Sequence, residues 1–376
     1  MRGTSRFLPI ALIAVVALSS SARANEANEW DETVDKSVAY LRKTQAKDGS
    51  WGGKQAVGVT GVIVTGLLRT GKVSAKDPMV DKALAYIETL ITKEGHIAGK
   101  GATANLHNYV TSINVMALVA ADRPAYKAPI ENAVAFLKKL QWDEGHGKDA
   151  KSDFHGGAGY DSKSRPDLSN TQFFLEALVA AGLTKKDPTF AKAVIFVSRC
   201  QNMKGESNDQ PWAGKIDDGS FIYTAAKGGD TKVADDLDPK ADGGLPGYGS
   251  MTYAGVKSLL YCGIDKKDPR VVKARAWLAK NYTVERNPGM GKDREQWGIY
   301  YYYLAMARCL DALGEDRFID EKGAKHDWRA EITSALAKRQ QANGGWANAS
   351  DRWMEGNTAL VTGYALMTLA TTKPKK

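Results

Sequence analysis

An acid stands at the start of an apolar run in the segment PDLSNTQ, residues 166–172. The glycine-rich stretch HGGAGYDSKSR precedes this segment and FFLEALVAAG follows it, so a helix is predicted to begin here. Asp167 is therefore a candidate catalytic acid at a helix N-terminus. The spacing of Ser169 and Gln172 also matches a capping box, in which the serine hydroxyl accepts a backbone N–H and the glutamine reaches back. Asp293 and Gln296 repeat this spacing before WGIYYYY, which favours capping over catalysis.

Other polar and aromatic residues stand near the predicted starts of apolar helices. They give a candidate ligand-binding set of His155, Tyr160, Asp161, Asn170, Tyr253, Trp297, Tyr301, Trp353 and Glu355. Tyr300 to Tyr303 and Tyr364 enlarge the aromatic group, which predicts either a packed core or the wall of an apolar pocket. No metal and no cofactor is expected, because His107 and His155 have no convincing third ligand and the acidic loop near Asp217 lacks calcium-site spacing.

The helices that carry these residues follow from a repeated junction. TGKVSAKDPMVDKALAYI from Thr70, AGLTKKDPTFAKAVIFV from Ala181 and CGIDKKDPRVVKARAWL from Cys262 each end one apolar helix at Gly and start another at Asp-Pro. Along the chain, this pattern predicts six amphipathic helices, near 31–46, 79–92, 129–141, 188–201, 269–281 and 326–342. Each precedes a helix that is apolar nearly all round, near 56–70, 106–121, 169–181, 250–262, 295–313 and 356–370.

The two kinds of helix predict one architecture. A helix that is apolar all round must be enclosed, whereas an amphipathic helix covers a core. Six enclosed helices ringed by six covering ones satisfy both conditions. The sequence therefore predicts an all-α fold, an α/α toroid of about six helical hairpins, with an open solenoid of hairpins as the alternative.

Residues 1–24 have the features of a secretory signal peptide. Arg2 and Arg6 precede the apolar run FLPIALIAVVAL, and ARA at residues 22–24 is a small-residue cleavage site. We therefore expect an exported protein, periplasmic or extracellular, with no stable membrane span. Residues 25–376 are expected to form one domain.

Charge and cysteine content exclude several classes of protein. Removal of residues 1–24 takes away three arginines and no acids, so the formal net charge falls from +9 to +6. The remaining basic residues are spread over the amphipathic helices, and nucleic acid is not an expected partner. Cys200, Cys262 and Cys309 are too few for a disulfide framework. Buried free thiols are expected, although Cys262 and Cys309 could pair.

The turns from amphipathic to apolar helices carry a motif. QAKDGSW at 45–51 and QQANGGW at 340–346 both read Gln-x-x-x-Gly-x-Trp, and QWDEGHG at 141–147 and QNMKG at 201–205 are partial copies without the Trp. Physically, Gly permits the turn, the Gln amide ties off helix ends and Trp stacks beside it. The motif resembles the repeat of squalene-hopene cyclases and other terpenoid cyclases. From about residue 30 to its C-terminus, the chain thus resembles the prenyltransferase and squalene-oxidase repeat superfamily.

This resemblance implies where an acid should be. Cyclases that protonate squalene carry Asp-x-Asp-Asp at the start of an inner helix, and the middle Asp delivers the proton. The matching DLSN keeps Asp167 but has Ser169 and Asn170 in place of the other acids. A serine hydroxyl cannot protonate an alkene, so this initiating chemistry is not expected. The zinc-holding prenyltransferase branch is not matched either, because GYGSMTYAG at the comparable helix start has neither Asp nor Cys.

The sequence leaves three functions open. The first is the binding of an apolar or isoprenoid-like ligand, or of a partner, in a central cavity. The second is an enzyme, a cyclase or lyase, that uses another acid such as Asp161, Asp167, Asp217, Asp218 or Glu355. The third is a carbohydrate-active α/α toroid. The long connection 201–250 is interpreted as a solvated lid.

Overall fold

Two kinds of helix alternate along the chain, in the order that the repeated junctions predict. The computed structural model describes residues 10–100, 106–235, 237 and 242–375, with side chains from residue 26 onward. In these residues the outer helices are α1 (Ile10–Thr44), α3 (Pro78–Glu88), α5 (Lys127–Leu140), α7 (Pro188–Arg199), α9 (Pro269–Lys280) and α11 (Trp328–Arg339). The inner helices are α2 (Ala56–Thr70), α4 (His107–Ala121), α6 (Leu168–Ala180), α8 (Gly249–Tyr261), α10 (Ile299–Leu313) and α12 (Thr358–Thr372).

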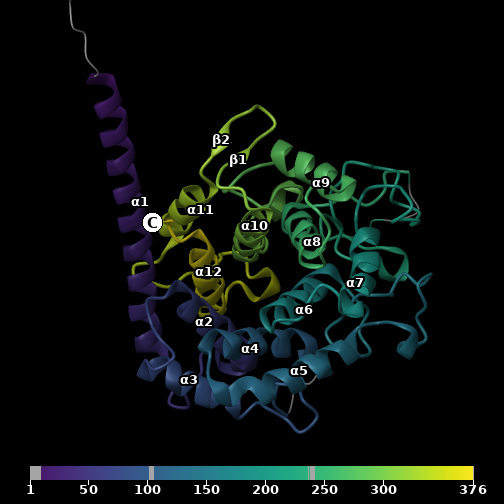
Figure 1. Ribbon diagram of the computed structural model, residues 1–376, viewed down its shortest axis with the longest axis horizontal. Coiled ribbons are helices and arrows are strands. Elements are labelled where there is room, and N and C mark those ends of the chain that lie inside the picture. Colours follow the sequence, from purple (N-terminus) through teal and green to yellow (C-terminus); the bar gives the residue numbers. More distant parts are fainter. Residues whose placement is uncertain (1–9, 101–105, 236, 238–241, 376) are drawn as a thin grey trace, which may run out of the picture.

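The inner helices form a closed ring inside the outer ones (Figure 1). Each inner helix packs on the next in chain order, and α12 packs on α2. In addition, the indole Nε1 of Trp30 in α1 donates to the carbonyl of Leu369 in α12 at 2.8 Å. These contacts join the two halves of the chain. The predicted all-α toroid is confirmed, and the open solenoid is excluded.

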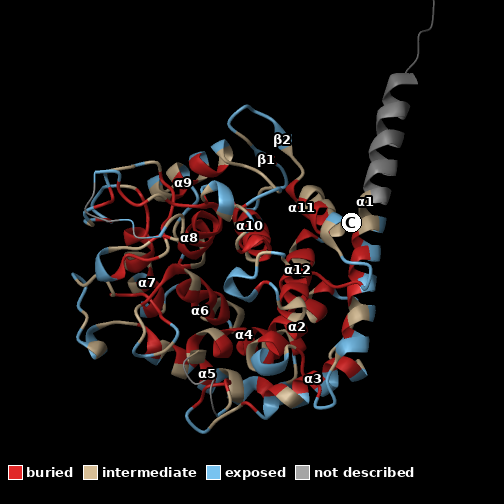
Figure 2. Ribbon diagram, turned by 180° about the vertical axis from the view of Figure 1, so that it is seen from behind, coloured by how far each residue is buried: buried red, intermediate tan, exposed pale blue. Residues whose placement is uncertain are grey.

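Hydrophobic burial follows the predicted division between the rings. Along α2, for example, Val59, Val62, Ile63, Val64 and Leu67 are all buried, on more than one face of the helix. The outer helices bury one side and expose the other (Figure 2). The hydrophobic core therefore lies both between the two rings and within the inner ring.

The Asp-Pro junctions start the outer helices by a local mechanism. Asp77, Asp187 and Asp268 cap α3, α7 and α9, and each side chain accepts from the backbone N–H two residues later at 2.9–3.0 Å. The following proline has no N–H to leave unsatisfied. Because an N-cap and a first-position proline act within one turn, these helix starts could be predicted from sequence.

The Gln-Gly-Trp turns join neighbouring outer helices. Gln45 Nε2 donates to the carbonyls of Gly49 at 2.9 Å and Met79 at 2.8 Å, which binds the turn to the start of the next outer helix. Trp51 Nε1 donates to Leu41 O at 3.0 Å. Gln340 makes the same pair of bonds, to Gly344 and to Thr33 in α1, both at 2.9 Å. The last motif therefore closes the outer ring onto the first helix.

The two partial copies of the motif use different glycines from those predicted. Gln141 Nε2 donates to Gly156 O at 2.9 Å, and Gln201 Nε2 donates to Gly219 O at 3.0 Å. Gly156 has a φ of 84°, and a Cβ there would lie 1.8 Å from the Lys192 carbonyl oxygen. The assignment to Gly145 and Gly205 is therefore wrong. An insertion between Gln and Gly moves the glycine along the sequence but keeps its place in the turn.

The long connection between α7 and α8 is not simply a solvated lid. Trp212, Phe221 and Leu245 in this segment are completely buried, and Gln201 forms a β-bridge with Phe221. Residues 236 and 238–241 lie outside the described residues. Where the segment is described, much of it belongs to the core, so that interpretation of the connection is wrong.

Shorter elements complete the described chain. A two-stranded antiparallel sheet, β1 (Phe318–Ile319) and β2 (Lys325–His326), lies between α10 and α11. The 3-10 helices are η1 (Gly53–Gln55), η3 (Pro124–Tyr126), η4 (Glu144–His146), η5 (Ala226–Gly228), η6 (Lys292–Arg294) and η7 (Arg352–Met354). They lie in the connections between the long helices.

Two further expectations concern export and cysteine chemistry. Of the predicted signal peptide, residues 1–9 lie outside the described residues. Among the helices of the described part, none has the combination of length and hydrophobicity required to cross a membrane. Cys200, Cys262 and Cys309 are free and buried, as expected for thiols that serve packing.

Candidate functional site

The inner helices begin at one face of the ring, which we call the mouth. The backbone N–H of Asn108 at the start of α4 donates to the carbonyl of Tyr160, in the connection that leads to α6, at 2.9 Å. Tyr301 at the start of α10 donates its hydroxyl to Ser169 Oγ in α6 at 3.1 Å. Asn357, which caps α12, contacts Gln55 before α2 at 3.5 Å. These contacts bring chain segments up to about 300 residues apart to one place.

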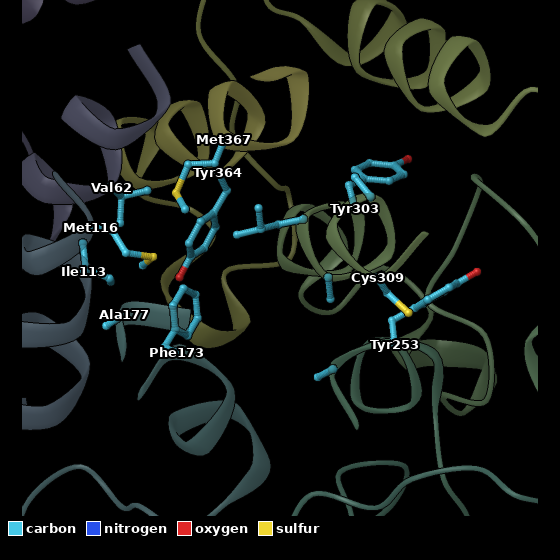
Figure 3. Packing of buried hydrophobic residues seen from close by; sticks show 14 of the residues in the cluster. Val62, Ile113, Met116, Phe173, Ala177, Tyr253, Tyr303, Cys309, Tyr364 and Met367 are labelled. Atoms are coloured by element: carbon cyan, nitrogen blue, oxygen red, sulfur yellow. The ribbon is translucent and has the colours of Figure 1, made fainter. Parts of the chain in front are cut away.

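Four aromatic side chains from four inner helices meet at the axis and form the axial aromatic cluster. They are Tyr109, Phe173, Tyr301 and Tyr364. The Tyr109 and Phe173 ring centroids are 4.7 Å apart, and Tyr301 lies 6.3 Å from both Phe173 and Tyr364. Figure 3 shows Phe173 and Tyr364 directed toward each other. Phe173 and Tyr364 are buried, so side chains occupy the axis at this level.

The hydroxyls of this cluster are paired with one another and with neighbouring polar groups. The Tyr109 and Tyr364 hydroxyls are 2.9 Å apart, and Gln172 Nε2 donates to the Tyr301 hydroxyl. Burial is the main cause that raises the pKa of Tyr109, Tyr301 and Tyr364. All three phenols are therefore neutral near pH 7. Their rings present an uncharged aromatic layer.

Asp167, the candidate acid, is the N-cap of α6. Its carboxylate accepts from the Asn170 backbone N–H and from Asn170 Nδ2, both at 2.8 Å. The predicted capping box of Ser169 and Gln172 is therefore wrong, since both side chains contact Tyr301 instead. Asp167 stands two residues earlier and accepts from the free backbone N–H of Asn170 in the first turn of the helix.

Burial sets the protonation of Asp167. Its side chain is almost completely enclosed, and this raises its pKa to about 6, while hydrogen bonds from Asn170 and Tyr223 and the charge of Arg165 act in the opposite direction. Asn170, a predicted ligand-binding residue, is completely buried and orients this carboxyl. Both oxygens of Asp167 are thus engaged within the helix start.

Glu355 caps the start of α10, as Asp167 caps the start of α6. One oxygen accepts from the backbone N–H groups of Tyr300 at 3.0 Å and Tyr301 at 2.9 Å, and the other accepts from Asn348 Nδ2 at 2.8 Å. Burial raises the pKa of Glu355 to about 7 against these hydrogen bonds. The carboxyl is supplied by the next repeat, not by the helix that it caps.

The second predicted capping box, Asp293 with Gln296, is also wrong, because neither residue is the N-cap of α10. The residue at the N-cap of α10 is Gly298, which has no side chain to accept a hydrogen bond. Gln296 Nε2 donates instead to Glu285 O at 2.9 Å. The free N–H groups of α10 are left for Glu355.

Apolar side chains are exposed around the mouth. Tyr160 is 38% exposed, Trp353 is 40% exposed and Met354 is 41% exposed. We call these three residues the exposed rim. Trp297 packs edge-on against Trp353, with ring centroids 6.1 Å apart. Trp353 and Met354 also have left-handed φ values of 58° and 67°. Such a conformation is costly for bulky residues.

Three of the predicted residues lie apart from the axial aromatic cluster. Tyr253 packs edge-on against Tyr302 at 5.7 Å, and Figure 3 shows it beside Cys309, away from Phe173. His155 Nδ1 bonds to the Lys148 carbonyl at 2.9 Å, in the connection between α5 and α6. Asp161 accepts from the backbone N–H groups of residues 163 and 164 and so holds a turn.

The two histidines that could have met do not. His107 stacks on His96 with ring centroids 4.4 Å apart, whereas His155 faces the carbonyl of Lys148. Across the described residues, no group of three or more His, Cys, Asp or Glu side chains could hold a metal ion. An open groove on the outer surface is lined by residues of α5 and of the connection that follows it, among them Glu131, Lys138 and His146.

Comparison with known proteins finds a family model and solved structures that are similar to this chain. Residues 54–224 match the family model of the squalene-hopene cyclase C-terminal domain. A variant of the type II terpene cyclase MstE from Scytonema, without ligand, has a TM-score of 0.56 at 13% identity over 93% of this chain and 99% of its own. A second variant, in complex with geranylgeranyl dihydroxybenzoate, has the same values. The predicted terpenoid cyclase-like resemblance is confirmed.

The terpenoid cyclase-like fold is shared more widely. A D-mannose isomerase structure has a TM-score of 0.55 at 12% identity over 90% of this chain and 96% of its own. No curated protein matches the sequence significantly. At these identities the structural likeness establishes the fold, and activity must be argued from the site.

A second group of axial residues in this terpenoid cyclase-like ring is not among those predicted from the sequence. Arg69, Glu176, Lys257 and Arg308 meet near the opposite ends of the inner helices. A signal was present, because Glu176, Lys257 and Arg308 are charged residues inside otherwise apolar helical runs, FFLEALVAAG, YAGVKSLLYC and IYYYYLAMARCL. A charged residue in an enclosed helix needs a partner, and here the partners come from other inner helices.

Proposed function

We propose that the protein binds an apolar, isoprenoid-like ligand at the mouth, against the exposed rim and the axial aromatic cluster. The observation that carries this proposal is the exposed rim itself. Tyr160 lies 6.5 Å from Tyr109 of the buried aromatic layer, measured between ring centroids. Trp353 and Met354 are exposed and have left-handed φ values, which are costly for bulky side chains. A ligand that covered these side chains would recover part of their apolar burial.

The carboxyls at the mouth favour binding over squalene cyclisation. Asp167 and Glu355 both use their oxygens to satisfy the N–H groups of inner helices. An acid in that role is not free to deliver a proton to an alkene. The segment that matches Asp-x-Asp-Asp also lacks the other two acids, because Ser169 and Asn170 stand at their positions.

A binding titration tests the proposal. Farnesol and geranylgeraniol are added to the purified protein, and tryptophan fluorescence is followed because Trp297 and Trp353 flank the mouth. We expect saturable binding, weakened about fivefold to tenfold in Met354→Ser, which removes apolar contact area but keeps both tryptophans. Val272→Ser is the matched control, since Val272 is an exposed apolar residue on outer helix α9. Absence of saturable binding to the unaltered protein would contradict the proposal.

The second candidate function is acid catalysis by Asp167. The observation in its favour is the pKa of about 6, which leaves part of this buried carboxyl protonated near neutral pH. Incubation with squalene and analysis of the products distinguishes the two functions. We expect no cyclic product. Formation of hopene-type products by the protein, and their loss in Asp167→Asn, would favour catalysis.

A carbohydrate-active toroid is the third candidate. The D-mannose isomerase likeness supports it at the level of fold alone. Glycoside hydrolysis by paired acids requires two carboxyls free to act across a sugar bond. Asp167 and Glu355 are each held by helix N–H groups, so the isoprenoid-like ligand is the better supported class.

We further propose that the protein is exported to the periplasm or the extracellular space. The basic, apolar and small-residue regions of residues 1–24 occur in signal-peptide order, and this sequence pattern supports the proposal. N-terminal sequencing of the mature protein is the direct measurement. We expect a start near Asn25, and an intact Met1 on the soluble protein would overturn the proposal.

A further inference from the structure

Four charged side chains from four inner helices meet near the axis, at the face where these helices end. We call them the axial charge cluster. Lys257 Nζ lies 2.8 Å from one oxygen of Glu176, and Arg308 pairs with the other oxygen. Arg69 Nη1 lies 3.8 Å from that same second oxygen. Glu176, Lys257 and Arg308 are each at least nine-tenths buried.

The charges in this cluster do not balance. Three cations surround one carboxylate, which leaves an excess of two positive charges when all are ionised. The next acid along α10, Asp311, is exposed and accepts from Arg329 at 2.9 Å. It therefore belongs to a surface pair. Buried charges are normally paired, because removing an ion from water costs several kcal/mol when nothing compensates it.

Hydrogen-bonding capacity is also left over. Arg308 Nε is buried and has no hydrogen-bond partner among the described residues, although guanidinium groups usually engage several of their N–H donors. An anion between the cations would supply both the missing charge and an acceptor.

Arg69 connects the cluster to solvent. Its side chain is 30% exposed, whereas the Glu176 side chain is 4% exposed. Arg69 is in the last turn of α2, so it lies at the face opposite the mouth. An anion could thus reach the cluster without passing the axial aromatic cluster.

We propose that the axial charge cluster is a binding site for a phosphate or carboxylate group, reached through Arg69. Guanidinium groups bind the oxygens of both anions through paired N–H donors, and the Lys257 ammonium adds a third contact. Glu176 pairs with the cations, and when all four groups are ionised two positive charges are left for the ligand. The site is separate from the apolar ligand proposed at the mouth and does not depend on it.

Thermal unfolding in the presence of anions tests this site. Inorganic phosphate and acetate are titrated separately, with sodium chloride adjusted to hold ionic strength constant. A ligand that binds only the folded protein raises Tm with a saturable dependence on its concentration. We expect such a rise with at least one of the two anions. A response to phosphate alone assigns a phosphate site, and a response to acetate shows that a carboxylate is accepted.

Two matched variants decide whether the effect comes from this cluster. Arg69→Gln removes its exposed cation and should raise the fitted Kd at least tenfold. Lys72→Gln removes a cation three residues away that pairs with Asp31 and Asp35 instead, and it should leave Kd unchanged. No saturable rise with either anion, or equal loss in both variants, would overturn the proposal. The cations would then only balance Glu176 and the negative helix C-termini.

Discussion

The two ends of the inner ring use charge in opposite ways. At the mouth, Asp167 and Glu355 lie against helix N-termini, where backbone N–H groups satisfy both carboxyls. At the other end, Arg69, Lys257 and Arg308 share the single carboxylate of Glu176. Negative side chains at helix N-termini and positive side chains near helix C-termini both interact favourably with the helix dipoles. The mouth has no surplus of charge, whereas the opposite end does.

This difference separates structural from ligand-binding chemistry. A carboxyl that accepts two or three N–H groups of a helix start has little left to offer a substrate. A cation that shares one carboxylate with other cations is not fully neutralised and can still attract an anion. In this ring, the acids that resemble catalytic groups in sequence are caps, and the stronger case for a polar ligand lies where sequence analysis placed none.

The largest expected effect is at the charged end. Glu176→Ala leaves three cations together without their carboxylate, and we expect it to lower the free energy of unfolding by about 3–5 kcal/mol. Urea denaturation measures the change. Asp311→Ala is the matched control and should cost less than about 1 kcal/mol, because its pair with Arg329 is exposed. Equal costs for the two variants would mean that Glu176 is not the centre of a buried network.

At the mouth, the expected effect is a pH dependence of stability. Burial raises the pKa of Glu355 in the folded protein to about 7, above its ordinary value of 4.5. The folded state therefore holds a proton that the unfolded chain releases between pH 4.5 and 7. Stability from this group is present at low pH and is lost as pH rises through that window. A shift of one pKa unit corresponds to about 1.4 kcal/mol.

The variant Glu355→Gln removes the contribution of this carboxyl to the pH dependence of stability. Urea unfolding at pH 5, 6 and 7.5 should show a smaller loss of stability in Glu355→Gln than in the unaltered protein as pH rises. Glu285→Gln, at an exposed glutamate near the same helix start, should retain the original slope. A slope that is identical in all three proteins would show that Glu355 does not titrate in this window.

Asp167 should behave as a cap. Asp167→Ala is expected to lower the free energy of unfolding by about 1–2 kcal/mol, since it removes the acceptor for the Asn170 N–H. Asp167→Asn should cost less than about 0.5 kcal/mol, because asparagine is an equally good N-cap. Thermal or urea unfolding distinguishes them. If Asn costs as much as Ala, the charge of the carboxyl matters more than its hydrogen bonds.

The smallest effect is expected at Ser169. Its hydroxyl accepts from Tyr301 and does not cap α6, so Ser169→Ala should cost about 0.5 kcal/mol, the low end for one lost hydrogen bond. Measured beside Asp167→Ala, this variant tests which residue caps the helix. A cost for Ser169→Ala above that of Asp167→Ala would restore the capping box predicted from sequence.

Much of the fold could be predicted because its determinants are local. The helix starts at Asp77, Asp187 and Asp268 depend on a cap and a proline within one turn. The apolar pattern of each inner helix follows from its enclosure and is visible in a window of fifteen residues or so. Even so, the glycine of the Gln141 turn is Gly156, which the fixed motif spacing could not identify.

The site itself depended on ring closure. The Tyr109 and Tyr364 hydroxyls meet across 255 residues, and Glu355 caps a helix that begins 56 residues before it. The sequence alone determined that six apolar helices would be enclosed by six amphipathic ones, since their apolar faces require it, but it left both a closed ring and an open solenoid possible. Only the tertiary structure decided which side chains meet at that axis, because the rotation and packing of each inner helix against its neighbours set the direction of every side chain. Arg308 and Glu176 lie in separate apolar runs of the sequence, and the closed ring makes them partners.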